Sequence, residues 1–260
     1  MRGLFVIFIS LFFIQCKSVP VAKYDLRWAD EFNVDGLPDE EKWSYEKGFV
    51  RNKELQYYTV KDSSTAWVKD GMLRIKLHKS ADGQVKSASL HTLGKFEFTH
   101  GKVEIRAKLP QGLGVWPAFW TLGTNIGEVG WPTCGEIDVM EYVGHDSNRI
   151  HSAIHTQKYN HAQNTSFKKS KKLAHLHDDF HIYSMEWKAD QISFFVDGNK
   201  FFSCDKKRED DIAAWPFVDA PQYMIVNLAY GGTWGGQQGV NDAILPQEYV
   251  IDYIRYYELI

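Results

Sequence analysis

The chain carries three carboxylates within six residues, in the run Gly135-Glu136-Ile137-Asp138-Val139-Met140-Glu141. The remaining residues of this run are apolar or glycine, which is typical of a β-strand. Glutamate and aspartate are unfavourable inside strands, and burying them costs free energy. A chemical task for the three carboxylates would compensate for that cost. The alternative interpretation is a solvated acidic edge strand.

The spacing of these carboxylates predicts a local irregularity in the strand. Residues two apart share a face of a regular strand, so Glu136 and Asp138 face together and Glu141 faces away. One extra residue bulged between Asp138 and Glu141 would turn all three to one face, as bulges do beside active sites. The carboxyls of Glu136 and Glu141 could then approach the ~5–5.5 Å separation of retaining glycosidases, rather than the ~6.5–9.5 Å of inverting ones. Repulsion by Asp138 would raise the pKa of a neighbouring carboxyl and let it act as an acid.

Short alternating segments separated by turn signals run through the rest of the chain. We expect strands over 72–77, 102–109, 223–228 and 249–257, a hairpin over 192–201 that turns at Asp197-Gly198, and one short helix over 208–214. Strands at this spacing predict an all-β fold, either an antiparallel sandwich or a jelly roll. The 260 residues amount to about one large all-β domain.

The composition is that of an ordinary globular protein, with 44% hydrophobic and 24% charged residues. The formal net charge of −3 gives no basic character that would indicate nucleic-acid binding. Aromatic residues reach 15%, and nine are tryptophans. Many of these rings belong to the core, but tryptophan and tyrosine faces also stack on the apolar ring faces of ligands.

The N-terminus has the features of a targeting segment. Arg2 precedes an apolar run over 4–14 that is too short to span a bilayer but suits a signal-peptide core. Cys16 follows this core and resembles a bacterial lipoprotein processing site. We therefore expect a signal peptide over 1–16 with a lipidated Cys16, or else ordinary cleavage and secretion. A linker over 17–24 and one catalytic domain over 25–260 would follow, in the periplasm or at the cell surface.

Cys134 and Cys204 remain after such processing, and two cysteines carry no disulfide framework, so we expect two free thiols. The segment 175–181 contains three histidines and two aspartates that could hold a metal, although such a stretch is more often a solvated turn. The lysines at 168, 169, 171 and 172 predict a surface loop, or contact with an acidic polysaccharide.

Tryptophans bracket the acidic strand in sequence: Trp116, Trp120, Trp131 and Trp234. A cleft lined by tryptophan beside carboxylates indicates a carbohydrate ligand, with core packing as the alternative, most of all for Trp120. The glycine-rich run 231–236 lacks the Lys-Ser/Thr of a phosphate loop, so a mobile loop carrying Trp234 fits it better. His155, on the strand expected after the acidic one, could reach the carboxylates as a hydrogen-bond partner.

These residues together resemble glycoside hydrolase family 16, specifically its laminarinase-like β-glucanases. The match runs from about Tyr24 to Glu258, and the family's E-x-D-x-x-E signature is complete at Glu136, Asp138 and Glu141. The flanking run 114–123, which contains Trp-Pro-Ala-Phe-Trp, is the next most specific segment. Further matches lie at 28–32, 52–58, 101–104 and 227–232.

The resemblance implies a jelly-roll β-sandwich of two antiparallel sheets with a concave cleft, and double displacement with retention of configuration. Glu136 would be the nucleophile, Glu141 the general acid/base, and Asp138 the residue that holds and tunes the nucleophile. Substrate-binding positions carried over from the family are Asn52, Glu54, Trp116, Trp120, Trp131, His155 and Trp234. No cofactor is implied for catalysis. A structural Ca²⁺ is implied at Glu31, the Gly71 carbonyl and Asp252.

The E-x-D-x-x-E spacing is similar to that of laminarinases, and this resemblance implies β-1,3-glucan as the substrate, with mixed β-1,3-1,4-glucan as a second one. We also expect a monomer. Three alternatives stay open at this point. The same fold can act on agar or carrageenan, it can serve as a non-catalytic glucan-binding module, and the same catalytic pair can perform transglycosylation.

Overall fold

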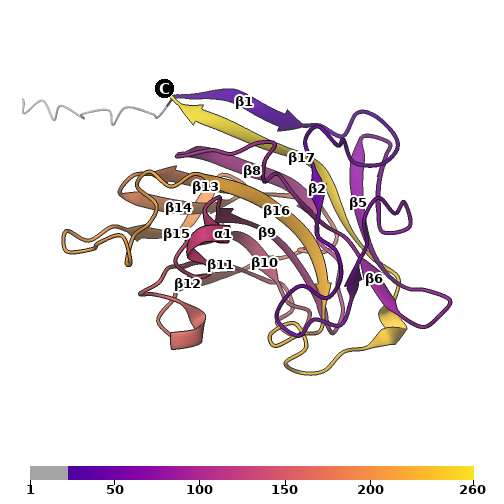
Figure 1. Cartoon of the computed structure of the whole chain (residues 1–260). Helices are drawn as coiled ribbons and strands as arrows, with labels where there is room; N and C mark the ends of the chain where they lie inside the picture. Colours follow the sequence, from indigo (N-terminus) through magenta and orange to yellow (C-terminus); the bar gives the residue numbers. More distant parts are fainter. Residues whose placement is uncertain (1–22) are drawn as a thin grey trace, which may run out of the picture.

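The computed structural model describes residues 23–260, which form two β-sheets packed on each other (Figure 1). The ten-stranded sheet has the order β15 (Asn199–Asp205), β14 (Gln191–Val196), β13 (His181–Lys188), β8 (Gly101–Lys108), β17 (Gln247–Leu259), β5 (Met72–Lys79), β6 (Val85–Ser87) and β3 (Tyr57–Tyr58). Beside this path, β1 (Tyr24–Asp30) pairs with β17, and β4 (Ala66–Lys69) pairs with β5.

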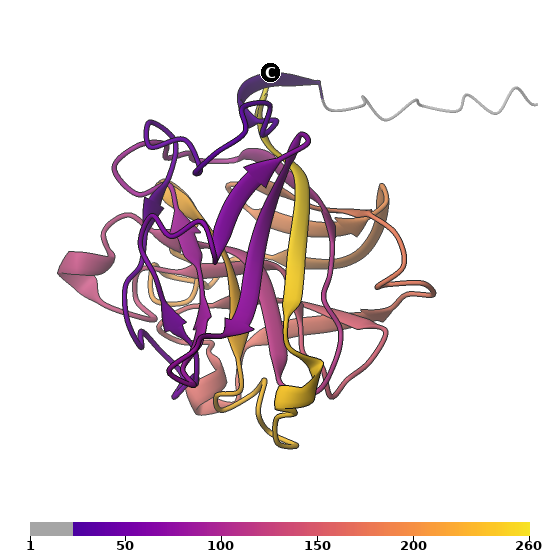
Figure 2. The same cartoon turned by 90° about the vertical axis from the view of Figure 1, so that its right-hand side faces the viewer.

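The seven-stranded sheet has the order β12 (Phe167–Lys172), β11 (Arg149–His155), β10 (Glu136–Tyr142), β9 (Val115–Gly123), β16 (Gln222–Tyr230), β7 (Ser89–His91) and β2 (Ser44–Tyr45). The helical elements are short: α1 (Ile126–Val129), η1 (His161–Gln163) and η2 (Asp242–Ile244). Strand pairs at the centre of both sheets are antiparallel, whereas β3 and β6 pair in parallel. Figure 2 shows β5 and β17 running side by side, as their pairing requires.

The predicted all-β sandwich is therefore confirmed, and the predicted strands correspond to β5, β8, β14, β15, β16 and β17. The hairpin turns at Asp197 and Gly198, whose φ angles of 50° and 74° are those of a two-residue primed turn. The helix expected over 208–214 is wrong. Asp210 accepts a hydrogen bond from the Lys207 N–H, and Asp211 from the Ala214 N–H, so aspartate side chains hold this segment in turns.

The main hydrophobic core lies between the sheets and takes alternate residues of each strand. On β9, Phe119 points into this core, while Trp116 and Trp120 belong to clusters on the opposite, outer face. All residues of β9 and β16 are nevertheless buried, because further side chains cover the outer face. Cys134 and Cys204 are buried free thiols, as predicted.

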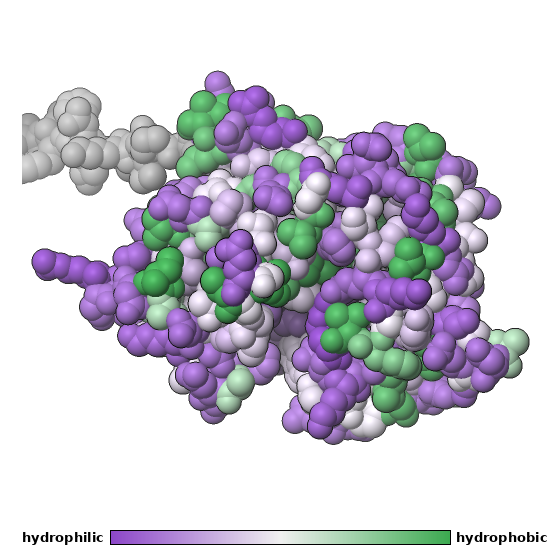
Figure 3. All heavy atoms as spheres, viewed as in Figure 1, coloured by the Kyte–Doolittle hydropathy of each residue, from purple (hydrophilic) through white to green (hydrophobic). Residues whose placement is uncertain are grey.

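The surface is hollowed in the lower half of the space-filling view, between the part that carries β12 and the part that carries β6 (Figure 3). The predicted signal peptide with Cys16 and most of the 17–24 linker lie outside the described residues, while β1 begins at Tyr24. Within residues 23–260, no helix has the length and apolar character needed to cross a membrane.

Candidate active site

A bulge in β10 brings the three carboxylates to one face of the seven-stranded sheet. Asp138 pairs with Ala153 of β11, but the next pair is Glu141 with His151, so two residues of β10 lie opposite a single residue of β11. The pairing with β9 shifts at the same point. Val139 and Met140 are consecutive, yet both are buried in the core between the sheets. The bulge predicted from the carboxylate spacing is confirmed, and Glu141 leaves the strand on the same side as Glu136 and Asp138.

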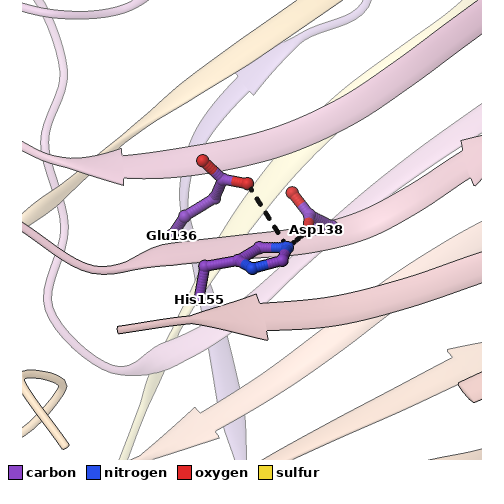
Figure 4. A group of neighbouring side chains, drawn as sticks. All are labelled: Glu136, Asp138 and His155. Atoms are coloured by element: carbon purple, nitrogen blue, oxygen red, sulfur yellow. Dashed lines mark ion pairs between the residues drawn. The ribbon is translucent and has the colours of Figure 1, made fainter. Parts of the chain in front are cut away.

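His155 contacts both carboxylates on the regular part of the strand (Figure 4). Its Nε2 lies 3.2 Å from Oδ2 of Asp138 and 3.7 Å from Oε1 of Glu136. The backbone N–H of His161 donates to Nδ1 of His155 at 3.2 Å, which leaves Nε2 facing the two carboxylates. His155 therefore lies against the Glu136–Asp138 pair, as its predicted position allowed.

Burial is the main influence on the acidity of all three carboxyls. It raises the pKa of Glu136 to about 8, with repulsion by Asp138 as the second cause, while His155 and a hydrogen bond from Trp131 act in the opposite direction. Burial also raises the pKa of Asp138. The pKa of Glu141 lies well above its ordinary value because of burial and the charges of Asp138 and Glu136. Like-charge repulsion therefore opposes ionisation of all three groups at once, and the Glu141 carboxyl favours its protonated form.

Two indole N–H groups fix the two glutamates. Trp116 of β9 donates from Nε1 to Oε1 of Glu141 at 3.0 Å, and Trp131, which precedes β10, donates to Oε2 of Glu136 at 2.8 Å. Trp131 is 38% exposed, so one of its faces is free for a ligand. Its ring also packs against His161, with centroids 4.9 Å apart. The carboxylate that lies deepest, Asp138, is thus flanked by two glutamates held in fixed orientations.

Glu54 is the centre of a second polar group on the loop before β3. It accepts hydrogen bonds from Asn52 at 3.2 Å, Gln56 at 2.7 Å and Tyr58 at 3.3 Å. Burial raises the pKa of the Glu54 carboxyl, although the nearby Arg51 guanidinium and these donors oppose the shift. Asn52 and Glu54, both predicted to bind substrate, therefore lie together in one hydrogen-bonded network.

This network continues through the sheet to Trp120. Tyr58 accepts a hydrogen bond from Asn227 of β16 at 2.9 Å, and the Trp120 indole donates to Asn227 at 2.8 Å. The Trp120 ring is only 7% exposed, and the Arg51 guanidinium lies 4.9 Å from its centroid. In this structure Trp120 supports the floor of the site and offers little surface for sugar stacking.

The glycine-rich loop after β16 carries Trp234 to the opposite end of the carboxylate row. The Trp234 ring packs edge-on against Trp116 at 5.4 Å and against His151 at 5.0 Å between centroids. Thr233 donates its backbone N–H to the Asn52 carbonyl at 2.8 Å. A side chain at Gly232 would come within 3.0 Å of both the Asn52 carbonyl and Glu54, and its φ of 76° favours glycine. The loop is thereby docked onto the Asn52–Glu54 network.

Comparisons with known proteins agree with this arrangement. Residues 53–255 match the sequence profile of glycosyl hydrolases family 16. The β-glucanase of Rhodothermus marinus is 42% identical over 251 residues, which cover 93% of this chain and 87% of that protein. The chain belongs to glycosyl hydrolase family 16.

Solved structures of family 16 enzymes also share the fold. The laminarinase from Rhodothermus marinus matches with a TM-score of 0.88 and 41% identity, over 93% of this chain and all of that one. A mutant of SCLam, a non-specific endo-β-1,3(4)-glucanase co-crystallised with 1,3-β-D-cellotriosyl-glucose, matches with a TM-score of 0.85 and 41% identity, over 90% of this chain and 95% of that one. The jelly-roll fold and the family predicted from sequence are confirmed.

The two carboxylates carried over from family 16 as calcium ligands are both paired with arginines. Glu31 accepts two hydrogen bonds from Arg255, at 2.7 and 2.9 Å, and Asp252 is paired with Arg106. Both carboxylates are thus already neutralised, and an ion would have to displace the arginines. Calcium at Glu31, Gly71 and Asp252 stays a prediction. Elsewhere within residues 23–260, Glu136, Asp138 and His155 bring possible metal-ligand atoms together, and these atoms lie within 4.8 Å of one another.

The remaining sequence clusters lie elsewhere. His175 contacts Asp178 at 3.2 Å, and His181 contacts Asp197 at 2.7 Å, so these histidines pair with separate carboxylates. The four lysines lie on the edge strand β12 instead of the predicted surface loop. Charged side chains on an edge strand discourage pairing with another chain.

Four further residues contact the site or its strand although the sequence predicted no role for them: Arg51, Tyr58, Asn227 and Ser152. Asn227 had a visible signal, because it is a polar residue within an apolar strand. Arg51 had none, since its contact with Trp120 joins residues far apart in the chain.

Proposed function

We propose that this family 16 enzyme is a retaining endo-β-1,3-glucanase that also accepts mixed β-1,3-1,4-glucan. The observation that carries the proposal is the bulge in β10, which places Glu136 and Glu141 on one face on either side of Asp138. Glu136 is the nucleophile, Glu141 the general acid/base, and Asp138 the group that tunes Glu136. The 42% identical β-glucanase and the laminarinase fold support β-glucan as the substrate class.

Double displacement requires a protonated Glu141 and an ionised Glu136. Glu141, with its raised pKa, gives its proton to the glycosidic oxygen while the Glu136 carboxylate attacks the anomeric carbon and the leaving sugar departs. The Glu141 carboxylate then takes a proton from water, whose oxygen attacks the same carbon and releases Glu136. The hydrogen bond from Trp131 and the contact with His155 oppose the rise in the Glu136 pKa that burial causes, and the Glu136 carboxylate attacks directly, without a separate base.

The groups around the carboxylates are of the kinds that bind sugars, namely aromatic rings and fixed polar groups. Trp131 offers an exposed ring face beside Glu136, and Trp234 covers the Glu141 side. Asn52 and Glu54 provide fixed polar groups for sugar hydroxyls. Trp116 and His155 act chiefly by holding carboxylates, and Trp120 by supporting the Asn227–Tyr58–Glu54 chain.

Digestion of laminarin, lichenan, agarose and carrageenan with product sizing tests the substrate class. We expect oligosaccharides from laminarin first, then from lichenan. Glu136→Ser should abolish release of reducing sugar, whereas Glu128→Ser, at an exposed position in α1, should not. A Glu136→Ser enzyme that degraded laminarin at the parent rate would refute the assignment. Products longer than the substrate at high oligosaccharide concentration would reveal transglycosylation.

We further propose that the protein works outside the cytoplasm and is attached through a lipid on Cys16, which lies outside the described residues. The support is the sequence pattern of the first sixteen residues. Labelling of the expressed protein with radioactive palmitate should be lost in Cys16→Ala. Equal labelling of the two proteins would contradict attachment at this residue.

A further inference from the structure

The bulge has a hydrogen-bond partner in the neighbouring strand that no part of the catalytic scheme uses. The register places Ala153 opposite Asp138 and His151 opposite Glu141, so Ser152 of β11 faces the inserted pair Val139–Met140. Its hydroxyl donates to the Val139 carbonyl at 2.7 Å. A bulge disrupts the local ladder, and Ser152 ties a carbonyl of the irregular segment to the next strand.

Ser152 is an unexpected residue at this position. It is fully buried, and the two residues that share its face on β11, Ile150 and Ile154, belong to the apolar core between the sheets. A buried hydroxyl in such surroundings costs free energy unless it is hydrogen-bonded. The bond to Val139 satisfies it, so the hydroxyl and the bulge depend on each other.

The bond lies on the Glu141 side of the regular pairing between β10 and β11. Glu136 and Asp138 lie on the regular side, where β10 and β11 pair residue by residue. The Val139 carbonyl lies after that regular part and two residues before Glu141, within the irregular segment that leads the backbone to Glu141. We propose that Ser152 is a positioning residue for the general acid/base Glu141; this rests on the proposed roles of Glu136 and Glu141.

Substrates that differ in their need for an acid test the proposal. A glucan leaving group requires a proton from Glu141, whereas a dinitrophenolate does not. For Ser152→Ala we expect kcat on laminarin to fall by about 10- to 100-fold with little change in KM, since small misplacements of a catalytic group have effects of this size. The kcat/KM on dinitrophenyl β-laminaribioside should stay within about threefold of the parent value. Azide, which attacks the glycosyl-enzyme without a general base, should raise kcat of the variant on this substrate and not that of the parent.

Three further variants make the outcome decisive. Ser152→Cys keeps a side chain of similar size, but its thiol is a weak donor. It should show the same pattern, and it replaces the alanine variant if that variant does not fold. Ser184→Ala removes a buried strand serine from the ten-stranded sheet and should leave both activities unchanged. Equal losses on both substrates for the Ser152 variants, without azide rescue, would overturn the proposal. Glu141→Ala tests the underlying roles separately: if it lacks the leaving-group and azide dependence, the assignment of Glu141 fails, whatever the Ser152 variants do.

Discussion

The Trp116 indole N–H donates to Oε1 of Glu141 over 3.0 Å, and this bond lowers the pKa of a carboxyl that burial raises. Trp116→Phe removes the donor and keeps an aromatic ring. The pKa of Glu141 should then rise further, so Glu141 keeps its proton to higher pH and the alkaline limb of the kcat/KM profile moves upward. The measurement is a pH profile of laminarin hydrolysis. An alkaline limb that stays in place or moves to lower pH would contradict the assignment of Glu141 as the acid.

Trp131 should control the acidic limb of the same pH profile, because its indole N–H donates to Glu136 and lowers the pKa of that carboxyl. In Trp131→Phe, Glu136 is harder to ionise, so the acidic limb should move to higher pH while the alkaline limb stays near its parent position. Because the three carboxyls interact, the midpoint of each limb is an apparent pKa of the set of carboxyls, which the change at one glutamate shifts. The two tryptophan variants serve as controls for each other. Identical shifts in both would show that the donors act on the cluster as a whole.

The sequence predicted the catalytic strand well because its signals are local. Three carboxylates at the spacing of Glu136, Asp138 and Glu141 require a bulge if they are to face together, and the structure has that bulge. Period-two alternation likewise placed β5, β8, β14, β15 and β17 of the ten-stranded sheet and β16 of the seven-stranded sheet. The error at 208–214 is also local: the aspartate side chains at 210 and 211 bond the backbone in turns, which apolar periodicity does not register.

The support of the site was not predictable in the same way, because it depends on contacts between distant segments. Arg51 covers the Trp120 ring, and Tyr58 meets Asn227 across 169 residues of sequence. Trp120 is an example. Its residue type allowed either stacking on a sugar or packing in the protein, and the structure shows packing because Arg51 lies over its ring. The arginines that pair with Glu31 and Asp252 were equally invisible in the sequence.

Removing the charge of Glu136 should stabilise the folded protein. A carboxyl whose pKa is about 8 when folded and near 4.5 when unfolded holds more protons in the folded state between these values, so the free energy of unfolding falls as pH rises through this window. Glu136→Gln removes this loss. It should raise the free energy of unfolding by on the order of 1–3 kcal/mol at pH 7 and by little at pH 4. Urea titrations at both pH values measure the difference, with exposed Glu128→Gln as the control. A gain of equal size at pH 4 would contradict the ionisation argument.

Tyr58 links the floor of the site to the substrate-binding loop, and Tyr58→Phe isolates that link. The change removes the donor to Glu54 and leaves the buried Asn227 amide without its acceptor, so we expect a loss of about 1–3 kcal/mol in the free energy of unfolding. Because Glu54 is proposed to bind substrate and not to take part in bond cleavage, KM should rise more than kcat falls. Tyr249→Phe is the matched control, since the Tyr249 hydroxyl is buried and has no hydrogen-bond partner among residues 23–260. A fall in kcat at unchanged KM in Tyr58→Phe would assign this network to the chemical step instead of to binding.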